Sequence, residues 1–277
     1  MARRIPSALV YPEISICLMR EKISACITAC NEEANIRRCL ESVKWADEIV
    51  VVDSFSADNT VKIAREYTDK VYSHEWLGYV GQKNLIRGMI SAEWVLFIDA
   101  DEEISDDLRM EIRKEFESGA CSQYDGYEFP RIVHFLGKWI THGDWYPDRK
   151  LRLFRKDRGK CVGPEPHDRV EVEGKVKRLR GHLNHYTYAN VEEQVAAANR
   201  FSSITAEIWH KEGKAFRLYH LLFRPPLRFL RCYFMRLGFL DGARGMMIAV
   251  LSAYGVFVKY AKLWELSRGE TQRESAR

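Results

Sequence analysis

The sequence lacks several features that would assign it to a common class of protein. No two of its seven cysteines have the Cys-x-x-Cys spacing of a structural zinc site, and their odd number argues against a complete disulfide framework. A bilayer-spanning helix needs about twenty apolar residues, but the late uncharged run, 245–258, has fourteen. Repeats and low-complexity linkers are also missing. We therefore expect reduced, buried thiols in a cytosolic protein.

Glycine is missing where a phosphate-binding loop would need it. The segment after the first predicted strand reads TACNEE, which argues against a soluble nucleotidyltransferase with a Gly-rich loop on a similar sheet. At the N-terminus, Pro12 and Glu13 interrupt the apolar run that a signal peptide requires, so residues 1–20 are interpreted as a loose extension.

Composition indicates a globular protein with a basic C-terminal part. Of the 277 residues, 46% are hydrophobic and 30% are charged, which is enough for a sizeable core. Residues 211–244 hold eight Lys/Arg against two Asp/Glu, a balance that favours an anionic partner. No nucleic-acid-binding motif accompanies these charges. We predict a catalytic domain over 21–210 and a basic, amphipathic, membrane-associating helical region over 211–277, with no nucleic acid partner.

Strand and helix patterns alternate through the first hundred residues. Strand-like runs occur at 22–29, 48–54, 70–76 and 94–101, and helical patterns lie between them. Asn31 is a candidate cap for the first helix. This order predicts a doubly wound α/β sheet whose ligands bind beyond the carboxyl ends of the strands. Antiparallel strands and then helices follow after the fourth strand.

Six acidic residues crowd the end of the fourth predicted strand, in the segment WVLFIDADEEIS and the two residues after it. Ser105 suits a helix N-cap, and Asp106 and Asp107 suit the first helical turn, where the helix dipole favours negative charge. Asp99 and Asp101 instead end a buried strand at the ligand-binding edge. Their oxygen atoms suit Mg²⁺ or Mn²⁺ holding a diphosphate, although a solvated acidic loop is the simpler alternative.

Two further polar residues belong to the same predicted edge. Asp53 ends the second strand and can accept a hydrogen bond from the ring N–H of uracil, thymine or guanine; otherwise it caps the following turn. Lys83, in GQKN, would face a phosphate if its helix begins at this edge; otherwise it is an ordinary exposed lysine.

These segments, in their order and spacing, resemble the family 2 glycosyltransferases of the GT-A fold. The resemblance rests on ISACITACNEE, VVDSFSADNT, GQKN and FIDADEE. The later segments DRKLRLFR, HLNHYTY, FLDGARG and KYAKLWE resemble the bacterial branch that includes β-1,4-glucosyltransferases of the lipopolysaccharide inner core. The resemblance covers roughly residues 22–266 and implies a GT-A-type doubly wound mixed sheet with a C-terminal amphipathic helical extension.

The resemblance also implies roles for individual residues. Thr28, Glu33 and Asp53 would line the nucleoside pocket, and Lys83 would lie near the diphosphate. Asp99 would contact the ribose or the metal, and Asp101 the metal. The segment matching GPEPHDRV usually carries a glutamate where this chain has Asp168.

An inverting transfer needs a carboxylate that removes a proton from the acceptor hydroxyl. Asp168 is our predicted catalytic base, with Asp144 and Glu165 as alternatives; a structural ion pair with a nearby arginine is the other possibility for Asp168. His182 and His185 are further candidates for contact with phosphate or metal.

We therefore expect an inverting, metal-assisted hexosyltransferase. It would move a sugar, by resemblance glucose, from a nucleotide-sugar donor such as a UDP-sugar to a lipid-linked or lipopolysaccharide-core saccharide. A non-catalytic nucleotide-sugar-binding relative and a nucleotidyltransferase are the alternatives.

The basic region predicts where the protein resides. A helix would align Arg224, Arg228 and Arg231 on one face, with Pro225 in its first turn and an apolar face beside them. Such a helix suits the surface of an anionic membrane. We expect a cytoplasmic protein that is peripheral on the inner face of the cytoplasmic membrane, and we expect the run 245–258 not to cross it. A helical subdomain that simply packs on the sheet is the alternative.

Overall fold

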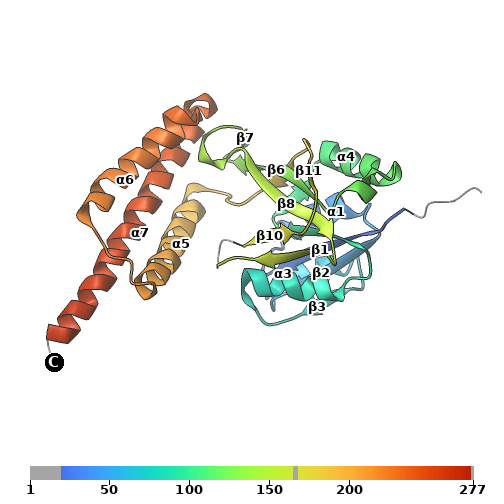
Figure 1. The fold of residues 1–277 in the computed structure, drawn as a ribbon, viewed down its shortest axis with the longest axis horizontal. Helices are drawn as coiled ribbons and strands as arrows, with labels where there is room; N and C mark the ends of the chain where they lie inside the picture. Colours follow the sequence, from blue (N-terminus) through green and yellow to red (C-terminus); the bar gives the residue numbers. More distant parts are fainter. Residues whose placement is uncertain (1–19, 165–167, 276–277) are drawn as a thin grey trace, which may run out of the picture.

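The computed structural model describes residues 20–164 and 168–275. It contains a sheet-based domain and, beside it, a unit of three long helices (Figure 1). The strands are β1 (Ile23–Ala29), β2 (Glu48–Asp53), β3 (Val71–Ser73), β4 (Trp94–Asp99), β5 (Glu102–Ile104), β6 (Gly126–Phe135), β7 (Lys138–Ile140), β8 (Asp148–Arg155), β9 (Gly159–Val162), β10 (Arg169–Val172), β11 (Val176–Arg178) and β12 (Leu183–His185). The α-helices are α1 (Ile36–Val43), α2 (Thr60–Ala64), α3 (Gly78–Met89), α4 (Asp106–Glu117), α5 (Val191–Lys211), α6 (Leu218–Leu230) and α7 (Ala243–Ser275).

The main sheet is mixed, in the order β3-β2-β1-β4-β8-β6-β12-β5. Strands β3, β2, β1 and β4 are parallel, and β8 joins them antiparallel to β4. The inner strands β1, β2 and β4 are buried almost throughout, because apolar helices and loops cover both of their faces. The predicted doubly wound arrangement of the first four strands is confirmed.

Local signals place the helices that flank the strand ends. The buried residues Ile36, Cys39, Leu40 and Val43 hold α1 against the sheet. Ser105 caps α4, because its side-chain oxygen accepts a hydrogen bond from the Leu108 N–H. The capping expected of Asn31 is wrong, since α1 begins only at Ile36. Asn31 has a positive φ of 56° and instead accepts a hydrogen bond from the Ala57 N–H.

Helices α5, α6 and α7 pack against one another and form the second unit (Figure 1). Ala206 of α5 is buried with Tyr260 and Leu263 of α7. Helix α5, which belongs to this unit, runs from Val191 to Lys211. The helical unit of the structure therefore begins at Val191, before the boundary that we predicted at residue 211. A second apolar cluster, which contains Phe135, Cys232 and Ile248, joins this unit to the sheet domain.

The structure changes two expectations about α6. The helix begins at Leu218, so Pro225 and Pro226 lie inside it rather than in its first turn, and a π-helical turn, η3 (Arg231–Met235), follows. The three aligned arginines also make contacts within the protein. Arg228 and Arg231 are ion-paired with Asp144, and the Arg224 guanidinium lies 5.4 Å from the centre of the Tyr260 ring.

The described cysteines follow the sequence prediction closely. Five of them are buried, Cys30 is exposed, and all six are free thiols. Buried thiols in an apolar environment resist ionisation, and burial raises the pKa of Cys121 to about 11.

Candidate active site

The parallel register brings the predicted nucleotide residues to one edge of the sheet. Thr28 at the end of β1 pairs with Asp99 at the end of β4, and Ala29 pairs with Asp53 at the end of β2. Asp101 follows β4 and is held by the Tyr186 N–H, which donates to its carbonyl oxygen at 2.9 Å. The carboxyl edge of the sheet therefore carries the acidic groups that the sequence placed there.

Lys83 joins this edge from α3. Its side chain is only 4% exposed, and its Nζ lies 3.1 Å from Asp99 Oδ1 and 2.9 Å from Asp168 Oδ2. An ordinary exposed lysine is thereby excluded. The lysine links two carboxylates that are 69 positions apart in the sequence.

Arg152 of β8 completes the pairing of Asp99. Its Nη2 lies 2.7 Å from Asp99 Oδ2 and 3.3 Å from the fully buried Glu102. Burial alone would raise the pKa of Asp99, but the charges of Arg152 and Lys83 hold that pKa well below its ordinary value. Asp99 is therefore an anion whose two oxygens face cationic side chains.

Sequence reasoning missed Arg152 and its neighbours. Arg131 of β6 pairs with both Glu102 and Asp148, so the charges form a continuous network beneath Asp99. The segment LRLF contains the signal, because an arginine between buried apolar neighbours must find a buried anion.

Asp101 and His185 form the part of the site that fits a divalent cation. His185 Nε2 lies 3.0 Å from Asp101 Oδ2, and its buried Nδ1 has no hydrogen-bond partner among the described residues. The described residues contain no ready-made cluster of three or more metal-ligating side chains. Mg²⁺ in particular is commonly held by one or two carboxylates together with substrate phosphates, so the donor set fits such an ion. The metal roles of Asp99 and Asp101 stay predictions.

Asp53 and Glu33 stabilise the two loops at this edge. Asp53 is buried and accepts hydrogen bonds from the Ser56 N–H, at 2.9 Å, and the Ser56 hydroxyl. Glu33 accepts hydrogen bonds from the backbone and side-chain N–H groups of Asn59, at 3.0 and 2.8 Å. The turn-capping alternative for Asp53 is thus present in the structure. The nucleoside contacts of Thr28, Glu33 and Asp53 stay predictions.

The three base candidates occupy different surroundings. Asp168, which is 16% exposed, pairs with Lys83, whereas Arg169 pairs with Glu171. Asp144 is 5% exposed and is held by Arg228 at 2.9 Å and Arg231 at 3.7 Å. Glu165 lies outside the described residues. Asp168 is therefore the base candidate that the structure brings to Asp99 and Lys83.

Comparison with known proteins identifies the family. A family model described as "Glycosyl transferase family 2" matches residues 24–170, more than half of the chain. The chain is a family 2 glycosyltransferase. This confirms the predicted transferase class and the GT-A-type mixed sheet, and it decides against the nucleotidyltransferase.

Relatives of this glycosyltransferase extend over most of its length. An uncharacterized glycosyltransferase of Rickettsia typhi is 36% identical over 89% of this chain and 88% of its own. The lipopolysaccharide core biosynthesis glycosyltransferase LpsC of Rhizobium meliloti is 33% identical over 88% of this chain and 92% of its own. Among solved structures, S. aureus TarS 1–349 with UDP-GlcNAc superimposes with a TM-score of 0.45 and 13% identity, over 90% of this chain and 92% of TarS.

Proposed function

We propose that this glycosyltransferase moves a sugar from a UDP-sugar to a lipid-linked or lipopolysaccharide-core saccharide, with inversion at the anomeric carbon. The observation that carries the proposal is the meeting of Asp53, Asp99, Asp101, Lys83 and Asp168 at one edge of the sheet. Such a transfer needs recognition of the donor, stabilisation of the departing diphosphate and a proton acceptor. A carboxylate at the nucleobase, a cation site and Asp168 would supply these three.

The donor is proposed from the chemistry of the edge. Asp53 is a hydrogen-bond acceptor at the end of β2, which suits the ring N–H of uracil, whereas adenine lacks this donor. Lys83 and Arg152 supply positive charge beside Asp99, where a diphosphate would approach. Glucose as the transferred sugar follows from the resemblance to inner-core glucosyltransferases, and the LpsC relative, named for lipopolysaccharide core biosynthesis, supports the proposed acceptor.

Asp101, with His185 beside it and Asp99 nearby, would hold a divalent ion such as Mg²⁺ or Mn²⁺. When bound, that ion supplies Lewis-acid stabilisation of the departing diphosphate. Lys83 holds the Asp168 carboxylate at this edge through a contact of 2.9 Å. Asp168 would remove the proton from the acceptor hydroxyl as that oxygen attacks the anomeric carbon.

The test is direct identification of the product. The purified protein is incubated with UDP-[¹³C]glucose, Mn²⁺ and a deacylated inner-core oligosaccharide, and the product is examined by NMR. A new β-linked glucose, formed from the α-linked donor, supports the proposal. An α-linked product would overturn inversion, and transfer from GDP- or dTDP-sugars but not from UDP-sugars would overturn the choice of donor.

We also propose that the helical unit lies on the membrane. Most of the large apolar side chains that are exposed in the described residues belong to the segment 218–264. They are Leu218, Tyr219, Leu222, Phe223, Leu227, Leu230, Phe234, Met235, Leu237, Phe239, Leu240, Met246, Met247, Val250, Tyr254, Phe257 and Trp264. A high density of exposed apolar side chains is a common feature of interaction sites.

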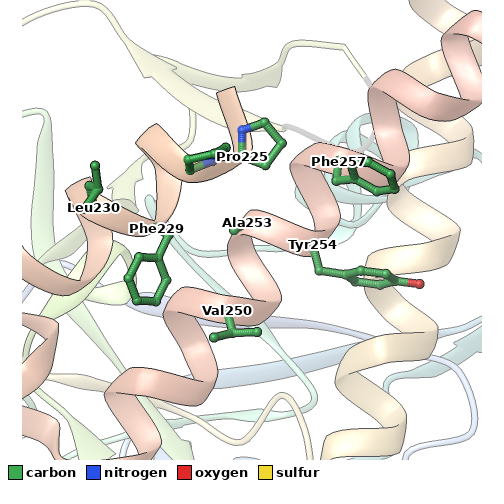
Figure 2. Close-up of a pocket in the computed structure, with 8 residues that line it drawn as sticks. Pro225, Phe229, Leu230, Val250, Ala253, Tyr254 and Phe257 are labelled. Carbon is green, nitrogen blue, oxygen red and sulfur yellow. The ribbon is translucent and has the colours of Figure 1, made fainter. Parts of the chain in front are cut away.

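The apolar surface continues into a groove between α6 and α7 (Figure 2). The groove encloses about 520 Å³ and is lined by Pro225, Pro226, Phe229, Leu230, Val250, Ala253, Tyr254 and Phe257. Exposed Arg224 and Arg236 on the same segment would attract anionic headgroups, each contributing on the order of 1 kcal/mol. Apolar side chains with basic neighbours suit a surface that inserts into the membrane interface.

One helix in the described residues, Ala243–Arg268, is long and apolar enough to cross a membrane by length and composition alone. We nevertheless propose an interfacial arrangement, because this helix packs along α5 and α6 and buries Ile248, Ala249, Tyr260 and Leu263. The proposed location is the cytoplasmic face of the inner membrane, where sugar nucleotides and lipid-linked acceptors would meet.

Vesicle sedimentation tests the membrane proposal. Leu222→Glu combined with Phe223→Glu should strongly reduce binding to vesicles containing phosphatidylglycerol. Met110→Glu, which changes an apolar residue on α4 that is 59% exposed, serves as the matched control. Unchanged binding of the double variant would remove α6 from the membrane contact. The arginine face is a poorer target, because two of its residues neutralise the buried Asp144.

A further inference from the structure

Phe55 is an aromatic residue in an unusual position. It lies in the loop between β2 and α2, its side chain is 64% exposed, and its backbone has a positive φ of 56°. Residues with a Cβ rarely adopt this conformation, and backbone strain of this kind clusters at ligand sites. Among the described residues, Phe55 belongs to none of the apolar clusters. Packing of its side chain within the protein therefore does not explain it.

The backbone around Phe55 is fixed by hydrogen bonds on both sides. Before it, the Ser54 N–H donates to the Ala29 carbonyl oxygen at 2.9 Å. After it, Ser56 donates to the Asp53 carboxylate and accepts the Asn31 N–H at 2.7 Å. The loop is thus held against the end of β1, and the backbone of Phe55 is fixed at the sheet edge with its phenyl ring exposed.

That point is two residues beyond Asp53, the acceptor that we propose for the ring N–H of the nucleobase. A carboxylate recognises the edge of a base, whereas an aromatic ring covers one of its flat faces. Placing both on one short loop would fix the base in two directions.

We propose that Phe55 is the stacking residue for the nucleobase of the donor. The inference rests on the proposed nucleotide-sugar donor, and it adds the residue that determines how the base is held. It also explains the strain, because the αL backbone at Phe55 presents the ring outward instead of letting it join the core.

Calorimetric titration with UDP in the presence of Mn²⁺ tests this role. Phe55→Ala should weaken UDP binding about ten- to a hundredfold, the usual range for loss of one base-stacking aromatic. Phe55→Tyr should restore most of the affinity. Binding of inorganic pyrophosphate with Mn²⁺ should be unchanged in both variants, because it has no base to stack.

Met110→Ala is the matched control, since Met110 is 59% exposed on α4 and lies outside both the nucleotide site and the proposed membrane surface. It should bind UDP as the wild type does. Urea unfolding should show Phe55→Ala to be at least as stable as the wild type, because its side chain is exposed.

Equal UDP affinity of Phe55→Ala and wild type would overturn the inference and leave the proposed function intact. An equal loss of pyrophosphate affinity would also overturn it, by indicating damage to the loop. If the wild type bound none of UDP, GDP and dTDP, the proposed donor and this inference would fail together.

Discussion

Replacing Asp168 by asparagine separates a catalytic role from a structural one. Asparagine has nearly the same shape, and its carbonyl oxygen can still accept the Lys83 hydrogen bond that Asp168 receives at 2.9 Å. It cannot take a proton from an acceptor hydroxyl. We therefore expect kcat to fall by about 10²–10⁴, which is roughly 2.7–5.5 kcal/mol of lost transition-state stabilisation.

The same substitution should have a smaller effect on stability. Asp168 is 16% exposed, and Lys83 keeps its contact with Asp99 at 3.1 Å when the charge is removed. The loss should be about 1–2 kcal/mol, somewhat below the usual value for breaking a hydrogen bond between charged groups. Urea unfolding measures this loss, and calorimetry should find UDP affinity essentially unchanged.

Asp144→Asn provides the comparison. It leaves Arg228 and Arg231 without their buried anion, so we expect about 1–3 kcal/mol of destabilisation after allowing for their solvent exposure. Its kcat, measured below the unfolding temperature by release of UDP, should stay within tenfold of wild type. Full turnover of Asp168→Asn together with a hundredfold loss in Asp144→Asn would refute the assignment and make Asp144 the base.

Three further outcomes follow from the same contacts. Asp101→Ala should abolish transfer, as EDTA should in the wild type, because without the metal the diphosphate would have to leave with its charge unmatched. Full activity of the variant in EDTA would contradict this. Arg152→Met should destabilise the protein by about 3–5 kcal/mol in urea unfolding, since the buried Glu102 loses a cation; a loss below about 1 kcal/mol would argue against the network. Burial would raise the pKa of Glu48, but hydrogen bonds from Lys70, Ser24 and Ser91 lower it to about 2. Because the pKa of Glu48 is lower in the folded protein, ionised Glu48 stabilises the fold. This stabilisation is fully present above about pH 4.5 and is lost toward pH 2. Glu48→Gln should thus cost about 3 kcal/mol at pH 7 and much less near pH 2; a cost that does not change with pH would contradict the shift.

Much of the fold could be predicted because its signals are local. Continuous apolar runs identified β1, β2 and β4, and their parallel order placed Asp53 and Asp99 at one edge. Ser105 was predicted as a cap because its own helix follows it directly. In each case the deciding contacts lie within the segment or follow from a general rule of sheet topology.

The remaining features depend on contacts between distant segments. The pairing of Lys83 with Asp168 joins α3 to the residue before β10, and nothing in either segment specifies the partner. The partner of the arginines in and just after α6 could not be predicted for the same reason. Arg228 and Arg231 align as expected of a helix. Both are ion-paired with Asp144, which lies more than eighty residues earlier in the sequence. Helix periodicity predicts which residues share a face, and only the fold decides what that face contacts.

Calorimetric titration of the wild-type protein with UDP-glucose, with and without Mn²⁺, tests the central claim most directly. If Asp101 and His185 hold a metal against the donor diphosphate, binding should be tight with Mn²⁺ and weak in EDTA. Asp101→Ala should bind UDP-glucose weakly under both conditions. UDP-glucose affinity that is the same with Mn²⁺ and with EDTA would contradict the metal-assisted site, and no affinity for any UDP-sugar would contradict the proposed donor.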